Sequence, residues 1–320
     1  MLVKHILNKK LLVLNVFDKP VKDFLTDELK KMGYDPSEFE VVFDAAIRSA
    51  KEMIHESETS LPSPILRSKL GEHSFNYLRG VLSQTEKLSG AHKRIKSYGS
   101  VFLVGAGISF ESGMPLSDIL GDILRFCKAG SYDELRNDSD KCLRFKNEFR
   151  KICLSKAPGQ SHKSMALNYP KHIWEIVCLN WDNLIERGAS EIGKSVSKVN
   201  EDRIPVGKSH LWKFHGDVEL IGKDNERGKG GWVLPDEKGY VFDCFAEYIK
   251  TSGLGSSIFT FLIVGYSEKE EEIYNAIIDQ FEDKPPRPTY RIGLDLSRLK
   301  EDNYIVGPSA FVLKEILPLK

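Results

Sequence analysis

The sequence has 320 residues, enough for one large domain or two smaller ones. Its 46 basic and 46 acidic residues give zero net charge, so composition offers no global argument for binding nucleic acid or an anionic membrane. The odd number of cysteines, five, argues against a disulfide framework, and the lack of a Cys-x-x-Cys pair argues against a zinc ribbon. No apolar run approaches a membrane span and the N-terminus lacks a long signal core, so we expect a cytoplasmic protein.

The first 92 residues have a helical pattern. Between Phe39 and Ile54, apolar residues recur at steps of three and four, which predicts an amphipathic helix. Shorter patterns of the same kind predict helices near 24–32 and 66–82. No catalytic or metal-binding motif stands out, and we interpret residues 1–92 as a helical segment that forms core or a partner surface.

A short apolar run, Val101–Val104, leads into the small residues Gly105, Ala106 and Gly107, followed by Ile108-Ser109. This order predicts a buried strand that turns into a helix, as at the start of a nucleotide-binding α/β unit. Small residues let backbone amides approach a pyrophosphate, and a helix N-terminus favours its charge. By itself, a plain tight strand–helix turn explains the stretch equally well, because Phe110 stands where the GxGxxG fingerprint has glycine.

A helical stretch follows the turn. Ser117 is a plausible N-cap for an amphipathic helix over residues 119–126. The charged segment 130–170 predicts a small helical module inserted after the first strand–helix unit. Within it, we interpret His162 as a helix-capping or core histidine.

Two later apolar runs end in polar residues. The run 173–179 predicts a buried strand and is followed by Asn180 and Asp182, which could also simply cap the next helix. The run 210–214 predicts another strand and is followed by His215. If both strands belong to a parallel sheet, these residues lie at its carboxyl edge, where doubly wound sheets bind ligands.

Two more strands are predicted near the C-terminus. The strongly apolar run 259–264 ends in Gly265 and is followed by Ser267. The run 290–296 contains Asp295, an acidic residue that could contact a ribose or could be a solvated surface side chain.

Over residues 95–320, these motifs together resemble the sirtuin superfamily of NAD-consuming Rossmann proteins. The resemblance is carried by Gly105-Ala106-Gly107-Ile108-Ser109 with Ser112-Gly113-Met114-Pro115, by Asn180-x-Asp182, by His215-Gly216 and by Gly265-x-Ser267. It implies an α/β fold with a Rossmann-like, mostly parallel sheet flanked by helices and with an inserted helical module. The pattern of residues 1–92 adds an N-terminal helical segment to this fold.

The sequence also departs from the usual sirtuin pattern. Leu116-Ser117-Asp118 stand where sirtuins usually carry Phe and Arg, and Leu179 precedes Asn180 where they usually carry glutamine. The paired zinc cysteines are missing, so no zinc is expected. This pattern looks like the divergent sirtuin-like domains of prokaryotic anti-phage defence proteins, which hydrolyse NAD rather than deacylate lysine.

The resemblance assigns roles to individual residues. Asn180 would position a water and the ribose hydroxyls, His215 would act as general base, and Asp182 would orient the network. The expected NAD-binding residues are Gly105, Ala106, Gly107, Ser109, Pro115, Asp118, Gly265, Ser267 and Asp295.

We therefore predict an NAD+ glycohydrolase that releases nicotinamide and ADP-ribose, a regulated effector of antiviral defence through NAD depletion. NAD+ is its substrate, residues 93–320 form the NAD-binding catalytic domain, and residues 1–92 serve regulation or oligomerisation. A homo-oligomer is expected, and a partner such as a defence ATPase or trigger protein is plausible; neither nucleic acid nor membrane is indicated. Two alternatives remain open: an NAD-dependent protein lysine deacylase, and a non-catalytic NAD or ADP-ribose sensor that acts through a partner.

Overall fold

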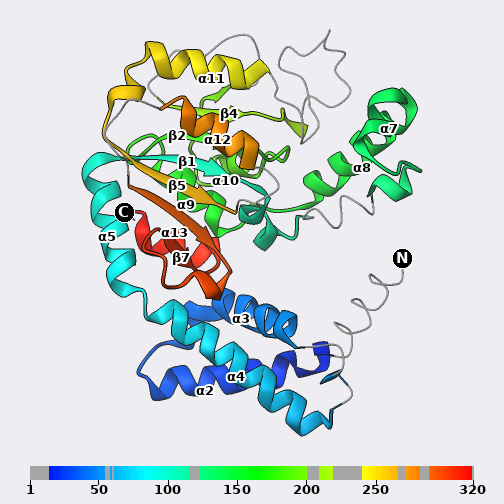
Figure 1. The fold of residues 1–320 in the computed structure, drawn as a ribbon, viewed down its shortest axis with the longest axis vertical. Helices are drawn as coiled ribbons and strands as arrows, with labels where there is room; N and C mark the ends of the chain where they lie inside the picture. The colour runs from blue at the N-terminus through cyan, green and yellow to red at the C-terminus, as the bar shows by residue number, and fades with distance from the viewer. Residues whose placement is uncertain are drawn as a thin grey trace.

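A computed structural model describes residues 14–54, 58–59, 61–114, 123–199, 209–218, 240–265, 271–281 and 288–318. Its centre is a seven-stranded sheet in the order β3-β4-β2-β1-β5-β6-β7, and all neighbouring strands run parallel. Parallel neighbours need long crossover connections, which the intervening helices supply. This arrangement confirms the predicted Rossmann-like α/β class (Figure 1).

The strands are β1 (Ser100–Val104), β2 (Ile173–Cys178), β3 (Lys198–Val199), β4 (His210–Lys213), β5 (Thr260–Val264), β6 (Thr289–Gly293) and β7 (Tyr304–Val306). Apolar runs in the sequence predicted β1, β2, β4, β5 and β6, whereas β3 and β7 are too short to give a pattern. After β1 the chain builds the sheet outward through β2 and β4, and from β5 it builds in the other direction. The strand order therefore reverses between β1 and β5, the place where open α/β sheets form a ligand crevice.

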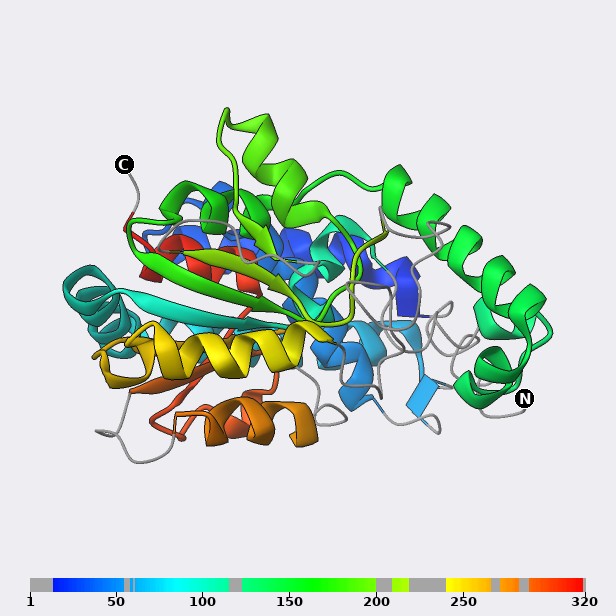
Figure 2. The ribbon, with the colours of Figure 1, turned by 90° about the horizontal axis from the view of Figure 1, so that it is seen from above.

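Among the described residues, the α-helices are α2 (Asp18–Lys31), α3 (Glu40–Met53), α4 (Ser63–Leu82), α5 (Thr85–Tyr98), α7 (Tyr132–Asn137), α8 (Ser139–Ser155), α9 (Gln160–Asn168), α10 (Leu184–Glu191), α11 (Tyr240–Thr251), α12 (Glu271–Asp279) and α13 (Ser309–Ile316). Seen from above, α11 and α12 lie on one face of the sheet, and α13 lies on the other (Figure 2). The module expected between β1 and β2 is present: α7 and α8 project away from the sheet, and α9 returns to it (Figure 1).

Successive side chains of a strand point to opposite faces of the sheet, so each face of the sheet has its own apolar core. In β1, Phe102 and Val104 belong to the cluster that includes α13, whereas Val101 and Leu103 belong to the cluster that includes α11. Every residue of β1 is buried, as expected for a central parallel strand covered on both faces.

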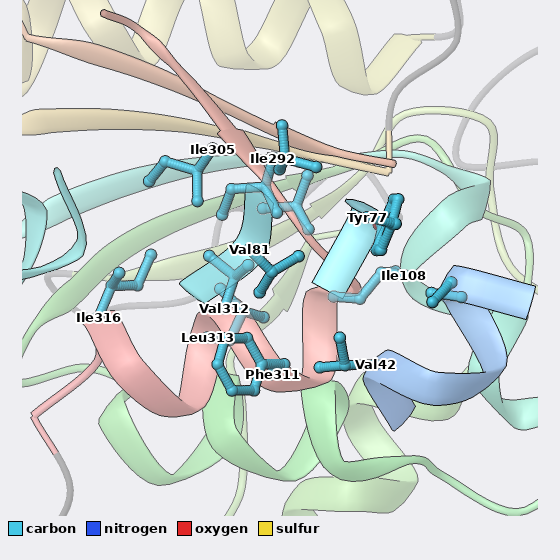
Figure 3. Close-up of a cluster of buried hydrophobic side chains, with 14 of the residues drawn as sticks. Val42, Tyr77, Val81, Ile108, Ile292, Ile305, Phe311, Val312, Leu313 and Ile316 are labelled. Carbon is cyan, nitrogen blue, oxygen red and sulfur yellow. The ribbon is translucent and has the colours of Figure 1, made fainter. Parts of the chain in front are cut away.

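The N-terminal helices share the first of these cores. Val42 of α3 and Tyr77 of α4 lie in one apolar cluster with Phe311 and Val312 of α13 (Figure 3). The helix α5 then runs directly into β1, so the boundary expected after residue 92 falls inside this helix.

The sheet edge at β7 is also covered from this segment. The Gln84 side chain donates to the carbonyl of Val306 and accepts from its amide, both at 2.8 Å. The carboxamide thereby pairs with β7 as a neighbouring strand would, and it satisfies backbone groups that an open edge leaves unpaired. In the parts of the chain that the structure describes, no helix has the length and apolarity needed to cross a membrane.

Candidate active site

The candidate site lies at the carboxyl ends of β1, β2, β4 and β5. The turn after β1 brings Ser109 there, the turn after β2 brings Asn180 and Asp182, and the turn after β4 brings His215. The structure therefore gathers the predicted catalytic residues at one edge of the sheet, next to the point where strand order reverses.

The turn after β1 is held to β5 by backbone contacts. The Gly105 amide donates to the Val264 carbonyl at 2.9 Å, and the Gly107 amide donates to the Gly265 carbonyl at 2.8 Å. A Cβ on Gly107 would lie 2.6 Å from the Cα of Gly265, so neither backbone leaves space for a side chain. The glycines thus serve close packing of two strand ends, and their amides are already committed.

The amides of Ile108 and Ser109 also donate within the turn, to the carbonyls of Gly105 and Ala106. The amide of Ala106 is the remaining one among residues 105–109, and no acceptor for it is found in the described part of the chain. If a pyrophosphate binds this turn, Ala106 is the backbone donor that the geometry offers it.

Ser109 connects the turn to the rest of the site. Its hydroxyl donates to Asp182 Oδ2 at 2.9 Å and lies 3.2 Å from both Asn180 Nδ2 and His162 Nε2. One donor and two acceptors are the full capacity of a hydroxyl. The structure thus places Ser109, which is 1% exposed, at the centre of a hydrogen-bond network.

His162 supports this network from α9, as the capping role predicted for it requires. Its Nδ1 accepts the Gly159 amide at 3.1 Å, so the ring proton is on Nε2, which donates to Ser109. Burial lowers the pKa of His162 to about 4, and the ring is neutral at physiological pH.

Asn180 and Asp182 flank Trp181 in the turn after β2, and each makes its own hydrogen bonds. The intervening Trp181 packs edge-on against Phe149 of α8, with ring centroids 5.0 Å apart. Asn180 Nδ2 donates to the Gly105 carbonyl at 3.1 Å as well as to Ser109, which leaves its Oδ1 as the acceptor available to a ligand. Asp182 Oδ1 accepts the amide of Leu184, the first residue of α10, at 3.0 Å, and this contact coexists with the contact to Ser109; the N-cap position of α10 belongs to Asn183.

His215 is 2% exposed and has a defined tautomer. Its Nδ1 lies 2.8 Å from the Leu179 carbonyl. Because a carbonyl only accepts, the proton is on Nδ1, and in the neutral ring Nε2 carries the lone pair. That is the form required of a general base.

A buried charge cluster behind these residues is absent from the sequence-based predictions. Lys213 donates through Nζ to the backbone carbonyl of Asp182 and lies 3.8 Å from Glu186 and 4.0 Å from Asp217. Lys198 lies 3.0 Å from Asp217. The available signal was a lysine between Trp212 and Phe214 in a predicted buried strand, which is unusual unless its charge is paired.

The other predicted site residues are placed differently. Gly265 packs against Gly107, as described above. Asp295 follows β6, is exposed, and accepts from the amide and hydroxyl of Ser297 at 3.0 and 2.7 Å. Pro115, Asp118 and Ser267 lie outside the described residues.

Cys178 lies at the end of β2, next to the site, and is not a nucleophile there. All five cysteines are free, and burial raises the pKa of the Cys178 thiol to about 12. A thiol with that pKa is not a nucleophile at neutral pH. Within the described ranges, no three histidine, cysteine or acidic side chains come together as metal ligands would.

Comparison with known proteins gives similarity at the level of structures. No family model and no curated protein matches the sequence. Solved Sir2 structures are similar in fold. One of them, which concerns the mechanism and regulation of Sir2 enzymes, has a TM-score of 0.47 at 18% identity, and the similarity covers 72% of this chain and 96% of that one. A Sir2 homologue in complex with NAD has a TM-score of 0.47 at 15% identity, covering 72% and 92%. Sir2Tm bound to a propionylated peptide has a TM-score of 0.46 at 16% identity, covering 71% and 96%.

Proposed function

We propose that the protein is an NAD+ glycohydrolase that cleaves the bond between nicotinamide and ribose. The observation that carries the proposal is the network centred on Ser109, which joins the turn after β1 to Asn180 and Asp182 at the carboxyl edge of the sheet. His215 stands at the end of the neighbouring strand β4 with a tautomer suited to accept a proton. A hydrogen-bond acceptor that can orient water and a base that can take its proton suit hydrolysis of a glycosidic C–N bond.

In the proposed reaction, the C1′–N bond breaks and neutral nicotinamide leaves with the electron pair, so the ribose gains oxocarbenium character. Water then adds to C1′, and its proton passes to His215 Nε2. Asn180 Oδ1 would accept a hydrogen bond from this water or from a ribose hydroxyl. Holding these groups in fixed positions lowers the entropic part of the barrier.

The direct test is to incubate the purified chain with NAD+ and no peptide, and to quantify nicotinamide and ADP-ribose by chromatography. We expect turnover in the parent and a loss of at least about 100-fold in Asn180→Ala and in His215→Ala. The exposed Asn137→Ala is the matched control and should retain parental turnover.

The same assay discriminates the alternatives. Turnover that requires an acetylated peptide and yields O-acetyl-ADP-ribose would replace hydrolysis by deacylation. ADP-ribose binding without turnover, at every protein concentration and with peptide present, would make the protein a sensor.

Regulation and a role in defence complete the proposal. Uncontrolled NAD+ hydrolysis would deplete the cell, so we expect activity to depend on self-association or on a trigger protein. Turnover per protomer should therefore rise with protein concentration, in step with the mass measured by light scattering. In cells challenged with phage, NAD+ should fall in the presence of the parent and not of His215→Ala.

A further inference from the structure

The buried Lys213 connects the two turns that carry the proposed catalytic residues. It is the last residue of β4, and its side chain is 1% exposed. Its ammonium donates to the backbone carbonyl of Asp182, in the turn after β2. His215 follows two residues later in the chain, so one side chain links the end of β4 to the Asp182 turn.

Acidic side chains keep this lysine charged. Burial by itself lowers the pKa of Lys213, but the nearby acids, Glu186 first among them, raise it above its ordinary value. Lys198 lies 3.9 Å from the same Glu186 oxygen and 3.0 Å from Asp217, so two lysines and two acidic side chains alternate. Burial raises the pKa of Glu186 to about 7, whereas Lys213 stays protonated, so the hydrogen bond to Asp182 comes from a full positive charge.

Stability alone does not account for such an arrangement. Replacing a buried ion pair by apolar side chains of similar size is often neutral or stabilising. The acceptor that Lys213 reaches is, moreover, the carbonyl of a residue whose two carboxylate oxygens contact Ser109 and the Leu184 amide. Two further bonds join the same segments, from the Val218 amide to the Trp181 carbonyl and from His215 Nδ1 to the Leu179 carbonyl, both at 2.8 Å.

We propose that Lys213 is a positioning residue, whose ammonium holds the Asp182 peptide against the end of β4 and so fixes Asn180 and Asp182 relative to His215. Glu186 keeps the ammonium in place. This inference rests on the proposed NAD+ hydrolysis for its effect on rate, but its effect on the two turns can be measured without any activity.

The test compares the parent with the double variant Lys213→Met/Glu186→Gln, which removes a cation and an anion together. Asp217 keeps Lys198 as its partner in this variant. Lys198→Met is the matched control, because Lys198 belongs to the same cluster, whereas the hydrogen bond to the Asp182 carbonyl comes from Lys213. The measurements are kcat and KM for NAD+, the Kd for ADP-ribose, and amide hydrogen exchange by NMR.

In the double variant we expect kcat to fall at least about 100-fold, because small misplacement of catalytic groups is costly, with the Kd for ADP-ribose within about threefold. Exchange of the Leu184 and Val218 amides should accelerate at least about tenfold, while the Phe102 amide in β1 stays protected. Lys198→Met should keep kcat within about threefold of the parent. If the double variant fails to fold, Lys213→Arg decides, with an expected loss in kcat of about tenfold because its planar fork cannot reproduce the ammonium geometry.

Several results would overturn the inference. Parental kcat in a folded double variant, or in Lys213→Arg where only that variant folds, removes the positioning role. An equal loss in Lys198→Met assigns the effect to the charge cluster as a whole. If the parent has no NAD+ turnover, accelerated exchange at Leu184 and Val218 supports the positioning of the turns while the proposed hydrolysis fails; unchanged exchange overturns the positioning role as well.

Discussion

The two halves of the candidate site are built in different ways. At the ends of β1 and β5, backbone packs directly on backbone, with Gly107 against Gly265 and no charged side chain between them. At the ends of β2 and β4, buried side chains make the connection, with Lys213 reaching across to Asp182. The first half depends on the absence of side chains, and the second depends on charged groups paired within the protein.

This difference determines what each half tolerates. A backbone contact at van der Waals distance has no adjustable part, so any added atom displaces a strand end. A side-chain network has rotamers that can adjust, but it responds to protonation. We therefore expect substitutions that enlarge a side chain to disrupt the first half, and changes in the charge of a side chain to disrupt the second.

The largest expected effect is that of Gly265→Ala on the first half. A Cβ at this position would lie 2.4 Å from the Ile108 amide nitrogen, and Gly265 has φ +65°. We expect a loss of at least about 3 kcal/mol in the free energy of unfolding, because the backbone must shift as well as adopt a strained conformation. Urea denaturation measures it.

Gly193→Ala is the matched control for this substitution. Gly193 has φ +69°, but a Cβ there meets nothing within 4 Å. It should therefore cost only the conformational penalty of about 1–2 kcal/mol. Equal losses in the two variants would show that conformation, and not contact between the strand ends, accounts for Gly265.

The next effect is a pH dependence at the junction of the two halves. The pKa of His162 is about 4 when folded against an ordinary value of 6.5, so the folded state binds fewer protons than the unfolded state. Its contribution to stability is complete above about pH 6.5 and is lost as the pH falls toward 4, by at most about 3 kcal/mol.

Replacement of His162 by glutamine tests this sign. Gln at this helix position can still accept from the Gly159 amide but does not titrate. The stability difference between parent and His162→Gln should therefore shrink by up to about 3 kcal/mol between pH 7 and pH 4 in urea titrations. The partly exposed His172→Gln is the comparison: burial and the nearby Lys171 also lower the pKa of His172, so its pH dependence should have the same sign. A stability difference for His162→Gln that stays constant with pH would contradict the assignment.

The two halves also differ in how well the sequence predicts them. Apolar runs that end in Gly105 or Gly265 follow from local pattern, and they predicted the strands β1 and β5 correctly; the reversal of strand order between them is visible only in the structure. The Lys213 cluster joins residues from β3, β4, α10 and the turn after β4, and no local spacing encodes their contact.

For some groups, the local sequence pattern predicts a different role from the one in the structure, or predicts none. The glycine turn predicts amides directed at a ligand, but the Gly105 and Gly107 amides donate to the end of β5, a partner more than 150 residues away. Gln84 has no signature at all, since its role depends on β7, a strand of three residues. These features depend on contacts between residues far apart in the chain, whereas hydrophobic periodicity in the sequence indicates only which residues are buried.

The smallest expected effect concerns the support of the first half by the N-terminal helices. Ile108 belongs to the turn after β1, is fully buried, and shares its cluster with Val42 and Tyr77 (Figure 3). Ile108→Val removes one methylene from this cluster and should cost about 1 kcal/mol in unfolding free energy. If the helices hold the turn in place, the Kd for ADP-ribose should also rise by about two- to fivefold, measured by calorimetry. Val81→Ala, in the same cluster but outside the turn, should lower stability by at least as much and leave that Kd unchanged; a parallel change in both variants would mean that the cluster affects binding only through global stability.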